Sequence, residues 1–519
     1  MNSDKTKVIW IGRKKLSKDK LDVNCNLVWG NTVFVLLGLK FNVNLNDMLD
    51  LNFEHAIAQI KNIFNHWNKR YLTPIGKITV IKTFAISKIT HLLATLPDPS
   101  ENTLKRINKL LFQFLWDNKP EKIKRHQATQ SYYQGGLNMI NLEHTKVSWP
   151  RRLLQIDNSP WAQLFESTIT SRQMLFELGR SNTVSILQQC KNMFWKDVLK
   201  SWIHLSKLNS TKSYLECLTS PLWLNPDISE YQLYIPNWFK NKISIVNDLI
   251  DTDGSVKNLQ KIIDQYNVDN IDFLTYHRLK LSIINYKAKH NRPTIDHNFL
   301  QLPTIPLQLC PLINQDKGTK RFYAKFNAET KKVYINEKWN RTLNLDFDDK
   351  QWKVIYKICF KSVQDNYLIW LQYKILNNIL GVNRFLHKIK VSMEPNCRLC
   401  NDEDESIIHL YCNCRKVEPL WNNLSNWIRN KLTYQIHIDN QTIIFGHLDT
   451  INKHIPLNTI LLVAKGYIFW CARSRKDPDI FQLQKWVKRV HDEQKAIAYK
   501  NFRHKFFHKN WNIWSTLFD

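Results

Sequence analysis

Residues 397–414 read CRLCNDEDESIIHLYCNC, and this window holds four of the ten cysteines of a 519-residue chain. Cys397 and Cys400 form a C-x2-C pair, His409 follows after eight residues, and Cys414 follows after four more. A C-x2-C turn lets two thiolates bind one ion, and the histidine and the last cysteine add a second pair of ligands from the next element. The spacing therefore predicts a tetrahedral zinc site with three sulfur ligands and one nitrogen ligand.

The fourth ligand position has a competitor, Cys412. Only two residues separate Cys412 from His409, which is a short gap for two ligands of one ion, so the spacing favours Cys414. Free cysteines that only pack in a core are the alternative interpretation of the window. Four protein ligands leave the ion no open position, so we expect a structural zinc that folds a small unit, with an apparent binding energy on the order of 10 kcal/mol.

The charge of the chain indicates a polyanionic partner. There are 74 Lys and Arg against 45 Asp and Glu, a formal net charge of +29, and such a field attracts phosphate backbones. The N-terminus has no apolar segment typical of a signal sequence, and the apolar run 459–470 is short and contains Lys465, which argues against a membrane span. We expect an intracellular protein of the cytoplasm and nucleus, in which clustered cysteines bind metal rather than form disulfides.

The first fifty residues carry strand patterns. These are VIWIG, LVW and TVFVLLGLKF, and the dipeptide Gly30-Asn31 between the last two suits a two-residue hairpin turn. A low glycine content, 12 residues, favours helices for the remainder. The expected fold is mainly α with a short N-terminal β remnant.

From residue 53 the apolar period becomes helical, and three helices with short connections predict an antiparallel bundle. Thr73 is expected to cap the second helix, with Pro74 in its first position, and Ser100 to cap the third. The apolar stripes of the three helices are Phe53, Ile57, Ile60, Phe64 and Trp67, then Ile78, Ile81, Ala85, Ile89 and Leu92, then Leu104, Ile107, Leu111 and Phe114.

This predicted bundle is basic. Residues 53–125 contain thirteen Lys and Arg and five acids. A solvated helical face explains any single lysine, but a stripe of cations also suits phosphate contacts, which need no sequence readout. The candidates for nucleic-acid binding in this part are Lys69, Arg70, Lys77, Lys82 and Lys88.

The rest of the chain reads as helices with interruptions. Residues 151–345 look like a helical connector, with the best linker candidate at 292–311. Helical pattern returns at Trp352, TIIFG (442–446) suggests a short extended piece, and two helices close the chain. The last mixes cations and aromatic residues, so Arg503 and Lys505 are candidates to bind RNA, although the aromatic residues also suit packing against the neighbouring helix.

Two acidic pairs could suggest catalysis. Polymerase carboxylates that hold two metal ions need a β-hairpin, whereas Asp348-Asp349 directly precedes a helical stripe and reads as an acidic first turn. Asp492 and Glu493 fall inside a helical pattern rather than on the strand that a nuclease site needs. Neither pair predicts a catalytic site.

Several segments resemble the C-terminal portion of reverse transcriptases from LINE-type non-long-terminal-repeat retrotransposons. WNKRYLTPIGKITVIKT (67–83), FLWDNK (114–119) and QGGLNMINLEHTKVSW (134–149) are similar to their thumb region, and 371–421 is similar to their zinc-binding region. NSDKTKVIWIG and FVLLGLKF resemble the end of the palm and the primer-grip hairpin. The resemblance is thin between 155 and 345.

The resemblance implies a protein that binds RNA and RNA–DNA hybrids, in association with element RNA, during target-primed reverse transcription. It places Lys5 at the palm lysine near the incoming nucleotide, but the endonuclease, the fingers and the catalytic Asp-Asp motif are not in this sequence. We therefore expect a truncated element without its own catalysis. The alternatives are an active polymerase or nuclease, and a cellular protein whose zinc unit binds a protein partner.

The expected division of the chain follows from these patterns and this resemblance. It comprises a palm remnant with a primer-grip-like hairpin (1–52), a thumb-like helical bundle (53–150), a helical connector (151–345), a Cys-Cys-His-Cys zinc region (346–460) and basic C-terminal helices (461–519).

Overall fold

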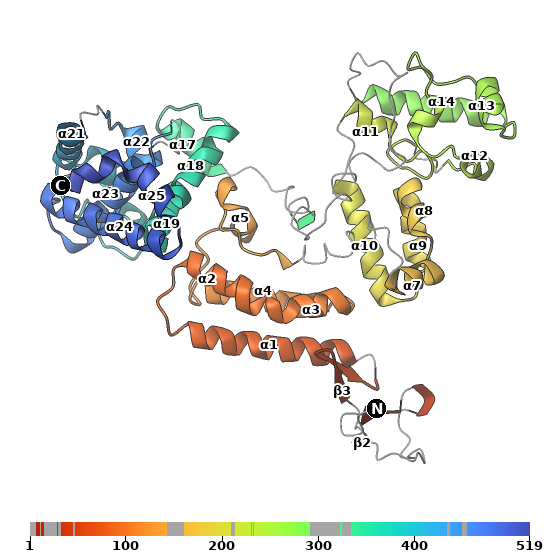
Figure 1. Ribbon diagram of the computed structural model, residues 1–519, viewed down its shortest axis with the longest axis horizontal. Helices are drawn as coiled ribbons and strands as arrows, with labels where there is room; N and C mark the ends of the chain where they lie inside the picture. Colours follow the sequence, from red (N-terminus) through yellow and green to blue (C-terminus); the bar gives the residue numbers. More distant parts are fainter. Residues whose placement is uncertain are drawn as a thin grey trace. The chain divides into compact units, whose positions relative to one another are not determined.

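The computed structural model describes residues 7–10, 12–14, 28–29, 33–44, 47–142, 160–208, 213–229, 231, 233–290, 322–323, 334–432, 436–448 and 454–518. The protein is mainly α, as predicted, with 65% of the described residues in helices (Figure 1). The chain forms two compact units. The first comprises Met1–Gln59, Ser87–Ile107 and Asn141–Glu329, and the second comprises Ile60–Ile86, Asn108–Ile140 and Thr330–Asp519.

Short strands pair in twos near the N-terminus. β1 (Lys7–Val8) lies parallel to β2 (Val28–Trp29), and β3 (Val33–Leu36) forms an antiparallel hairpin with β4 (Leu39–Asn42). The two residues between β3 and β4, Leu37 and Gly38, have φ of 50° and 81°, as a type I′ turn requires. The tight turn therefore lies inside FVLLGLKF, and the turn predicted at Gly30-Asn31 lies outside the described residues.

The predicted apolar stripes of residues 53–114 are buried, except that Trp67 and Leu104 are half-buried. Thr73 caps its helix as predicted, because its hydroxyl accepts from Gly76 N over 3.3 Å and Pro74 follows it. The prediction of one continuous second helix is wrong, because a π turn divides it into two α-helices. The elements are α1 (Met48–Trp67), α2 (Pro74–Val80), the π turn η4 (Ile81–Ala85), α3 (Ser87–Thr95) and α4 (Glu101–Leu115).

The connector has its own apolar cores in the first unit. One core gathers around Trp195 and Trp202, and the other, which we call the connector core, gathers around Trp223 and Trp238. The helices around them are α7 (Pro160–Thr168), α8 (Arg172–Glu177), α9 (Arg180–Gln189), α10 (Met193–Leu208), α11 (Tyr214–Leu218), α12 (Pro236–Lys240), the 3-10 turn η7 (Val246–Leu249), α13 (Leu259–Tyr266) and α14 (Phe273–Ala288).

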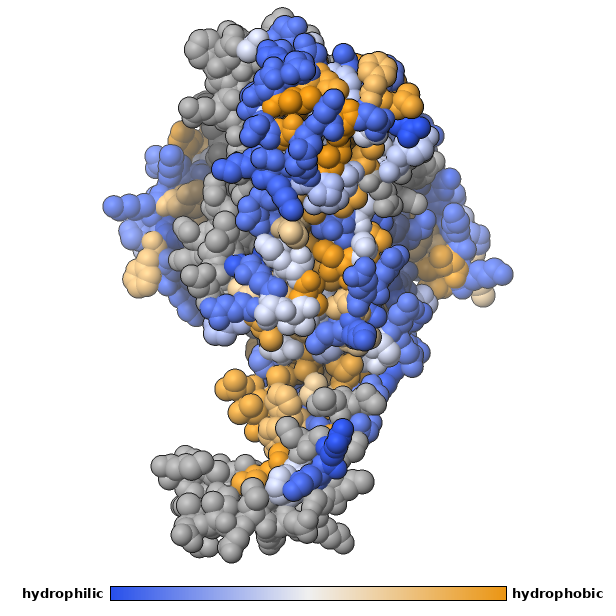
Figure 2. All heavy atoms as spheres, turned by 90° about the vertical axis from the view of Figure 1, so that its right-hand side faces the viewer, coloured by the Kyte–Doolittle hydropathy of each residue, from blue (hydrophilic) through white to orange (hydrophobic). Residues whose placement is uncertain are grey.

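On the face that Figure 2 presents, hydrophilic side chains of the described residues alternate with apolar patches. The predicted linker 292–311 lies outside the described residues. The segment PLWLNPD (221–227) contributes Leu222 and Trp223 to the connector core, so its prolines mark irregular core structure rather than a flexible break.

The second unit is built around α23 (Ile455–Ser474), which packs against α18 (Asp349–Ser362), α19 (Asn366–Leu376) and α24 (Ile480–Lys500). Besides α2 and η4, this unit contains α5 (Arg125–Thr129), η5 (Tyr132–Gln134), α17 (Tyr334–Thr342), α20 (Asn383–Lys388), the π turn η9 (His409–Asn413), α21 (Glu418–Leu432), α22 (Asn440–Phe445), α25 (His504–Trp511) and η10 (Ile513–Phe518).

Among the described residues, α23 is the one single helix long and apolar enough to cross a bilayer. However, 94% of its apolar window is buried inside the structure. The helix begins four residues before the apolar run 459–470 and ends four residues after it, so it is longer than the run suggested. Such burial inside the structure is typical of a helix in a protein core.

Two C-terminal predictions are wrong. The segment TIIFG is helical in α22, because Asp439 caps that helix by accepting from Thr442 N over 2.7 Å. The predicted final helix is two helices, α24 and α25. The chain turns between them at Phe502, whose φ is 56°.

Candidate metal centre and basic surface

The C-x2-C pair lies in a tight knuckle. Its two sides are antiparallel, and Cys397 N donates to Glu403 O over 2.7 Å. Between them the chain turns at Asn401, which has a left-handed φ of 66° and donates its N–H to Cys397 O over 2.9 Å. Asparagine adopts this conformation more readily than most residues. The turn brings the thiols of Cys397 and Cys400 close together.

His409 and Cys414 come from the π turn η9 and the residue that follows it. Residues five apart would be rotated by roughly 140° in an α-helix with 3.6 residues per turn. A π turn joins residues five apart by hydrogen bonds, so it places them on one face. The hydroxyl of Ser406 accepts from His409 N over 2.9 Å and fixes where the turn begins. The π geometry therefore selects Cys414 as the partner of His409.

The four predicted ligands are buried, and their ligand atoms all lie within 4.8 Å of one another. The sulfurs of Cys397 and Cys414 are 3.9 Å apart, and Cys400 Sγ is 3.2 Å from His409 Nε2. A tetrahedral ion with Zn–S bonds of about 2.3 Å holds its sulfur ligands roughly 3.8 Å apart. The donor set and its dimensions therefore suit one Zn²⁺ ion with no open coordination position.

An acidic side chain orients the histidine. Glu403 Oε2 lies 2.9 Å from His409 Nδ1, the ring nitrogen that faces away from the cluster. A carboxylate at this place favours the tautomer with the proton on Nδ1, which leaves Nε2 free to bind metal. The knuckle thus supplies both the ligand and its supporting carboxylate.

The pKa shifts of the cluster thiols also favour the binding of a cation. The hydrogen bond with Cys414 lowers the pKa of Cys397 to about 5, and the same bond raises the pKa of Cys414. Two adjacent thiolates repel each other, and a divalent cation between them removes that conflict. Burial raises the pKa of Cys412 to about 12, and this thiol is outside the cluster. Cys412 is therefore a packed, neutral cysteine.

A buried ion pair attaches the knuckle to its surroundings. Glu405 is fully buried, and its carboxylate accepts from the backbone and the guanidinium of Arg398 and from Asn383 N, with the Arg398 Nε bond at 2.9 Å. Asn383 is the first residue of α20, so the carboxylate also satisfies a free helix N–H. This network positions the knuckle independently of the metal ligands.

The predicted basic residues of the first helices differ in exposure. Lys69, Arg70 and Lys88 are exposed, and Lys82 is half-buried, which lowers its pKa below the ordinary value of a lysine. Lys77 departs from the prediction. It is 3% exposed, forms an ion pair with Asp117 and lies 5.6 Å from the ring centroid of Phe114. An ion pair within the protein neutralises its charge, so we no longer count Lys77 among the candidate nucleic-acid contacts.

At the C-terminus, Arg503 and Lys505 are both exposed. Arg503 immediately precedes α25, and Lys505 lies on it. Of the aromatic residues there, Phe507 and Trp511 are buried, whereas Phe506 is 61% exposed. Lys5, the residue that the resemblance placed near an incoming nucleotide, lies outside the described residues.

Sequence reasoning missed a basic groove beside the knuckle. A cavity of about 650 Å³ lies between α17, α20 and the residues that lead into His409. None of the described residues that line it is acidic, and its cations are Lys338, Arg384 and Lys388. Arg384 Nε lies 3.9 Å from the carboxylate of Asp404, which is outside the lining. Lys338 lies far from Arg384 and Lys388 in the sequence, so the three cations form no local cluster. Residues 384 and 388 are four apart, so in a helix both lie on one face. This spacing was the sequence signal from which the groove could have been found.

Both acidic pairs lie at or within helices, as the sequence predicted. Asp348 is the N-cap of α18, where its side chain accepts from Gln351 N over 2.7 Å, and Asp349 is the first helical residue. Asp492 and Glu493 are in the middle of α24. Neither pair forms the two-carboxylate metal site of a polymerase hairpin.

Comparison with known proteins gives two matches. Residues 329–421 match the family described as zinc-binding in reverse transcriptase, and this segment contains all four ligands. A protein of Arabidopsis thaliana named as a putative ribonuclease H protein is 28% identical over 125 residues, which is 22% of this chain. The chain spans about a fifth of this curated relative, 20%. Residues 329–421 are thus similar to the zinc-binding segment of reverse transcriptases, and they hold four side chains that suit one zinc ion.

Proposed function

We propose that this protein binds RNA and RNA–DNA hybrids, as a relative of the C-terminal portion of LINE-type retrotransposon reverse transcriptases. In this proposal it has no polymerase or endonuclease activity of its own, and its zinc is structural. The main support is the groove lined by Lys338, Arg384 and Lys388, which is free of acidic residues and adjoins a zinc knuckle in the segment matched to reverse transcriptases.

The zinc ion would stabilise the knuckle rather than react. When bound, it supplies a fixed positive centre that holds Cys397, Cys400, His409 and Cys414 together. Ser406, Ile407 and Ile408 line the groove and lead directly into His409. Holding His409 therefore also holds one wall of the groove. The knuckle acts on binding through this wall.

The groove suits a nucleic-acid strand by its chemistry. The half-buried ring of Phe385 offers apolar surface to bases, with the buried Trp339 and Ile407 beneath, while the three cations offer charge to phosphates. Lys69, Arg70 and Lys88 add exposed charge elsewhere on the protein. Recognition of this kind reads backbone charge and shape more than sequence.

Fluorescence anisotropy with a labelled RNA stem-loop and a labelled RNA–DNA hybrid tests the proposal. Each phosphate contact contributes about −0.7 to −0.9 to the slope of log K against log salt. We expect a steep slope for the wild type. The triple variant Lys338→Gln, Arg384→Gln and Lys388→Gln should bind more weakly, with a slope shallower by about 2 to 3.

A matched triple variant controls for net charge. Lys485→Gln, Lys488→Gln and Lys495→Gln remove the same charge from exposed positions on α24. This control should lose less affinity than the groove variant. Absence of RNA binding by the wild type, or binding that salt does not weaken, would overturn the proposal and would favour a protein partner for the zinc unit.

The enzymatic alternative has its own assay. The purified chain is incubated with a primed RNA template, the four deoxynucleotides and Mg²⁺, and separately with a DNA duplex. We expect neither primer extension nor cleavage. Extension or cleavage that survives further purification would instead establish an enzyme.

We also propose that the protein acts in the cytoplasm and the nucleus. A cation-rich RNA-binding protein meets its ligands in both places. Fluorescence microscopy of the tagged chain, co-stained for RNA, tests this assignment. Exclusive association with a membrane compartment would contradict it.

A further inference from the structure

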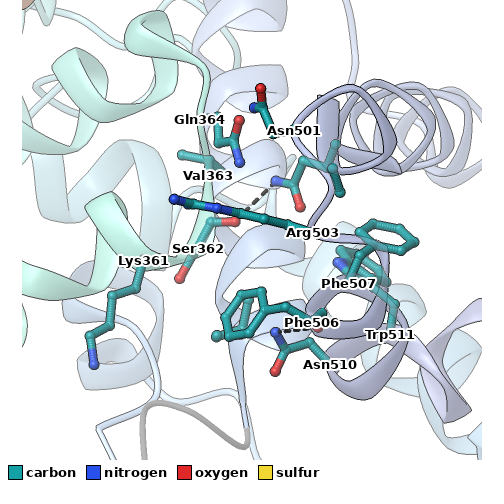
Figure 3. A pocket seen from close by; sticks show the side chains of 13 residues that line it. Lys361, Ser362, Val363, Gln364, Asn501, Arg503, Phe506, Phe507, Asn510 and Trp511 are labelled. Carbon is teal, nitrogen blue, oxygen red and sulfur yellow. Dashed lines mark hydrogen bonds between the residues drawn. The ribbon is translucent and has the colours of Figure 1, made fainter. Parts of the chain in front are cut away.

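A small pocket lies between the end of α18 and the α24–α25 turn, far along the chain from the zinc ligands (Figure 3). Its volume is about 80 Å³. Buried side chains form its floor, among them Val363, Phe507 and Trp511. Its polar lining consists of Lys361, Ser362, Gln364, Gln494, Asn501, Arg503 and Asn510. Among the described residues that line it there is no Asp or Glu, and Lys361 and Arg503 make the pocket cationic.

Arg503 supplies the main charge. Its side chain extends across the pocket toward Ser362 in Figure 3. Its backbone is fixed, since Arg503 N donates to Ala498 O over 2.8 Å. No acidic side chain in the described part of the chain forms an ion pair with its guanidinium. A guanidinium held over a pocket that lacks acids is suited to bind an oxyanion.

Ser362 gives a second, independent indication of a ligand. The residue is 2% exposed, and its hydroxyl has no hydrogen-bond partner among the described residues. Its carbonyl, in contrast, accepts from Thr459 Oγ1 over 2.7 Å and from Gln494 Nε2 over 3.0 Å, which holds the residue in place. Buried hydroxyls are normally paired, so an unpaired one in a pocket indicates a missing acceptor.

An aromatic ring stands at the rim. Phe506 is 61% exposed although two neighbours of its helix, Phe507 and Trp511, are buried. Its backbone carbonyl accepts from Asn510 Nδ2 over 3.0 Å. An exposed ring beside a cationic pocket is a stacking surface for a base whose phosphate occupies the pocket.

We infer that this pocket binds one phosphate of a single-stranded RNA, contacted by Arg503 and Ser362, while the adjoining base stacks on Phe506. The volume is below the roughly 300 to 1,000 Å³ of sites that enclose a whole small molecule, so it suits a phosphate-sized group. The inference rests on the proposed function and names a specific contact within it. The groove beside the knuckle is a separate surface.

The test compares charge-matched variants by anisotropy, with a labelled 20-nucleotide oligouridylate as the probe. Arg503→Gln should weaken binding about tenfold and make the salt slope shallower by about 0.7. Lys500→Gln removes the same charge three residues away, from an exposed side chain that does not line the pocket. It should change the affinity less than about twofold. Circular dichroism checks that both variants fold.

A second probe separates the phosphate from the base. Phe506→Leu should weaken oligouridylate binding about fivefold and leave binding of an abasic strand of equal length unchanged. Ser362→Ala should lower affinity for both strands without lowering the melting temperature, because the hydroxyl has no partner in the protein. If Ser362 had only a structural role, Ser362→Ala would lower the melting temperature together with the RNA affinity.

The outcomes distinguish this inference from the proposed function. If the wild type binds RNA but Arg503→Gln and Lys500→Gln lose affinity equally, the pocket is overturned and general charge attraction remains. Equal effects of Phe506→Leu on the abasic and the normal strand would overturn the stacking contact. If the wild type binds no RNA, the proposed function itself fails.

Discussion

The zinc knuckle and the connector core are held together by different forces, although short elements and irregular turns make up both. In the connector core nineteen buried side chains share the stabilisation, with Trp223 and Trp238 in edge contact at 6.3 Å between ring centroids. In the knuckle, four ligand atoms meet within 4.8 Å. A distributed core tolerates the loss of one contact better than a metal site tolerates the loss of one ligand.

The largest effect should come from removing ligands. Replacing Cys397 and Cys400 by serine should abolish stoichiometric zinc and unfold the knuckle, because an apparent binding energy on the order of 10 kcal/mol is lost. Elemental analysis measures the zinc, and hydrogen exchange of residues 395–414 measures the unfolding.

Cys412→Ser is the control for this double variant. Cys412 lies in the same window but outside the cluster, so the control should keep its zinc. Hydrogen exchange in the connector core should not change in either protein. Equal zinc in the double variant and the wild type would show that the four ligands do not bind the ion.

The second prediction concerns the loss of one buried side chain from the connector core. Trp223→Ala removes a fully buried ring and its hydrogen bond from Nε1 to Ile243 O, which is 2.6 Å long. We expect destabilisation of about 3–5 kcal/mol, measured by urea unfolding followed by hydrogen exchange in residues 214–286. Zinc content should stay at one ion per chain. Loss of zinc would mean that the two regions unfold together.

The third prediction concerns pH and the buried lysine of α23. Burial lowers the pKa of Lys465 from its ordinary 10.5 to about 7, and its ammonium donates to Gln372 Oε1 over 2.6 Å. Between pH 7 and 10.5 the unfolded chain binds a proton that the folded chain lacks, so stability should rise with pH. Below pH 7 the group is charged in both states and contributes no further change.

Lys465→Met removes this titration. From pH 7 to pH 10 the free energy of unfolding of the wild type should rise by a few kcal/mol relative to that of the variant. Urea unfolding at several pH values measures the difference, and the comparison cancels the other titrating groups. A constant difference across this range would contradict the lowered pKa of Lys465.

The smallest expected effect concerns the carboxylate behind the histidine. Glu403→Ala removes the acceptor at His409 Nδ1 and should weaken zinc binding about 10- to 100-fold without abolishing it. Competition with a chelator measures the affinity. Asp402→Ala is the control, because Asp402 pairs with Arg415 over 2.8 Å rather than with a ligand. Equal affinities of the two variants would show that Glu403 does not support the histidine.

Local patterns in the sequence predicted much of this architecture. The cap at Thr73, the acidic helix start at Asp348 and the buried helical stripes depend on residues within a few positions of one another. TIIFG was misread for the same reason, since β-branched residues favour strands until a cap such as Asp439 starts a helix. The break at Phe502 had no glycine or proline to mark it.

The sequence by itself determined the ligands of the zinc knuckle, because a C-x2-C turn and the histidine and cysteine after it are close along the chain. Only the tertiary structure decided which cations are available. It buried Lys77 against Asp117, brought Lys338 to Arg384 and Lys388, and placed Arg503 and Ser362 in the lining of one pocket. Exposure and distant contacts depend on how helices pack, and packing joins residues that no local spacing connects.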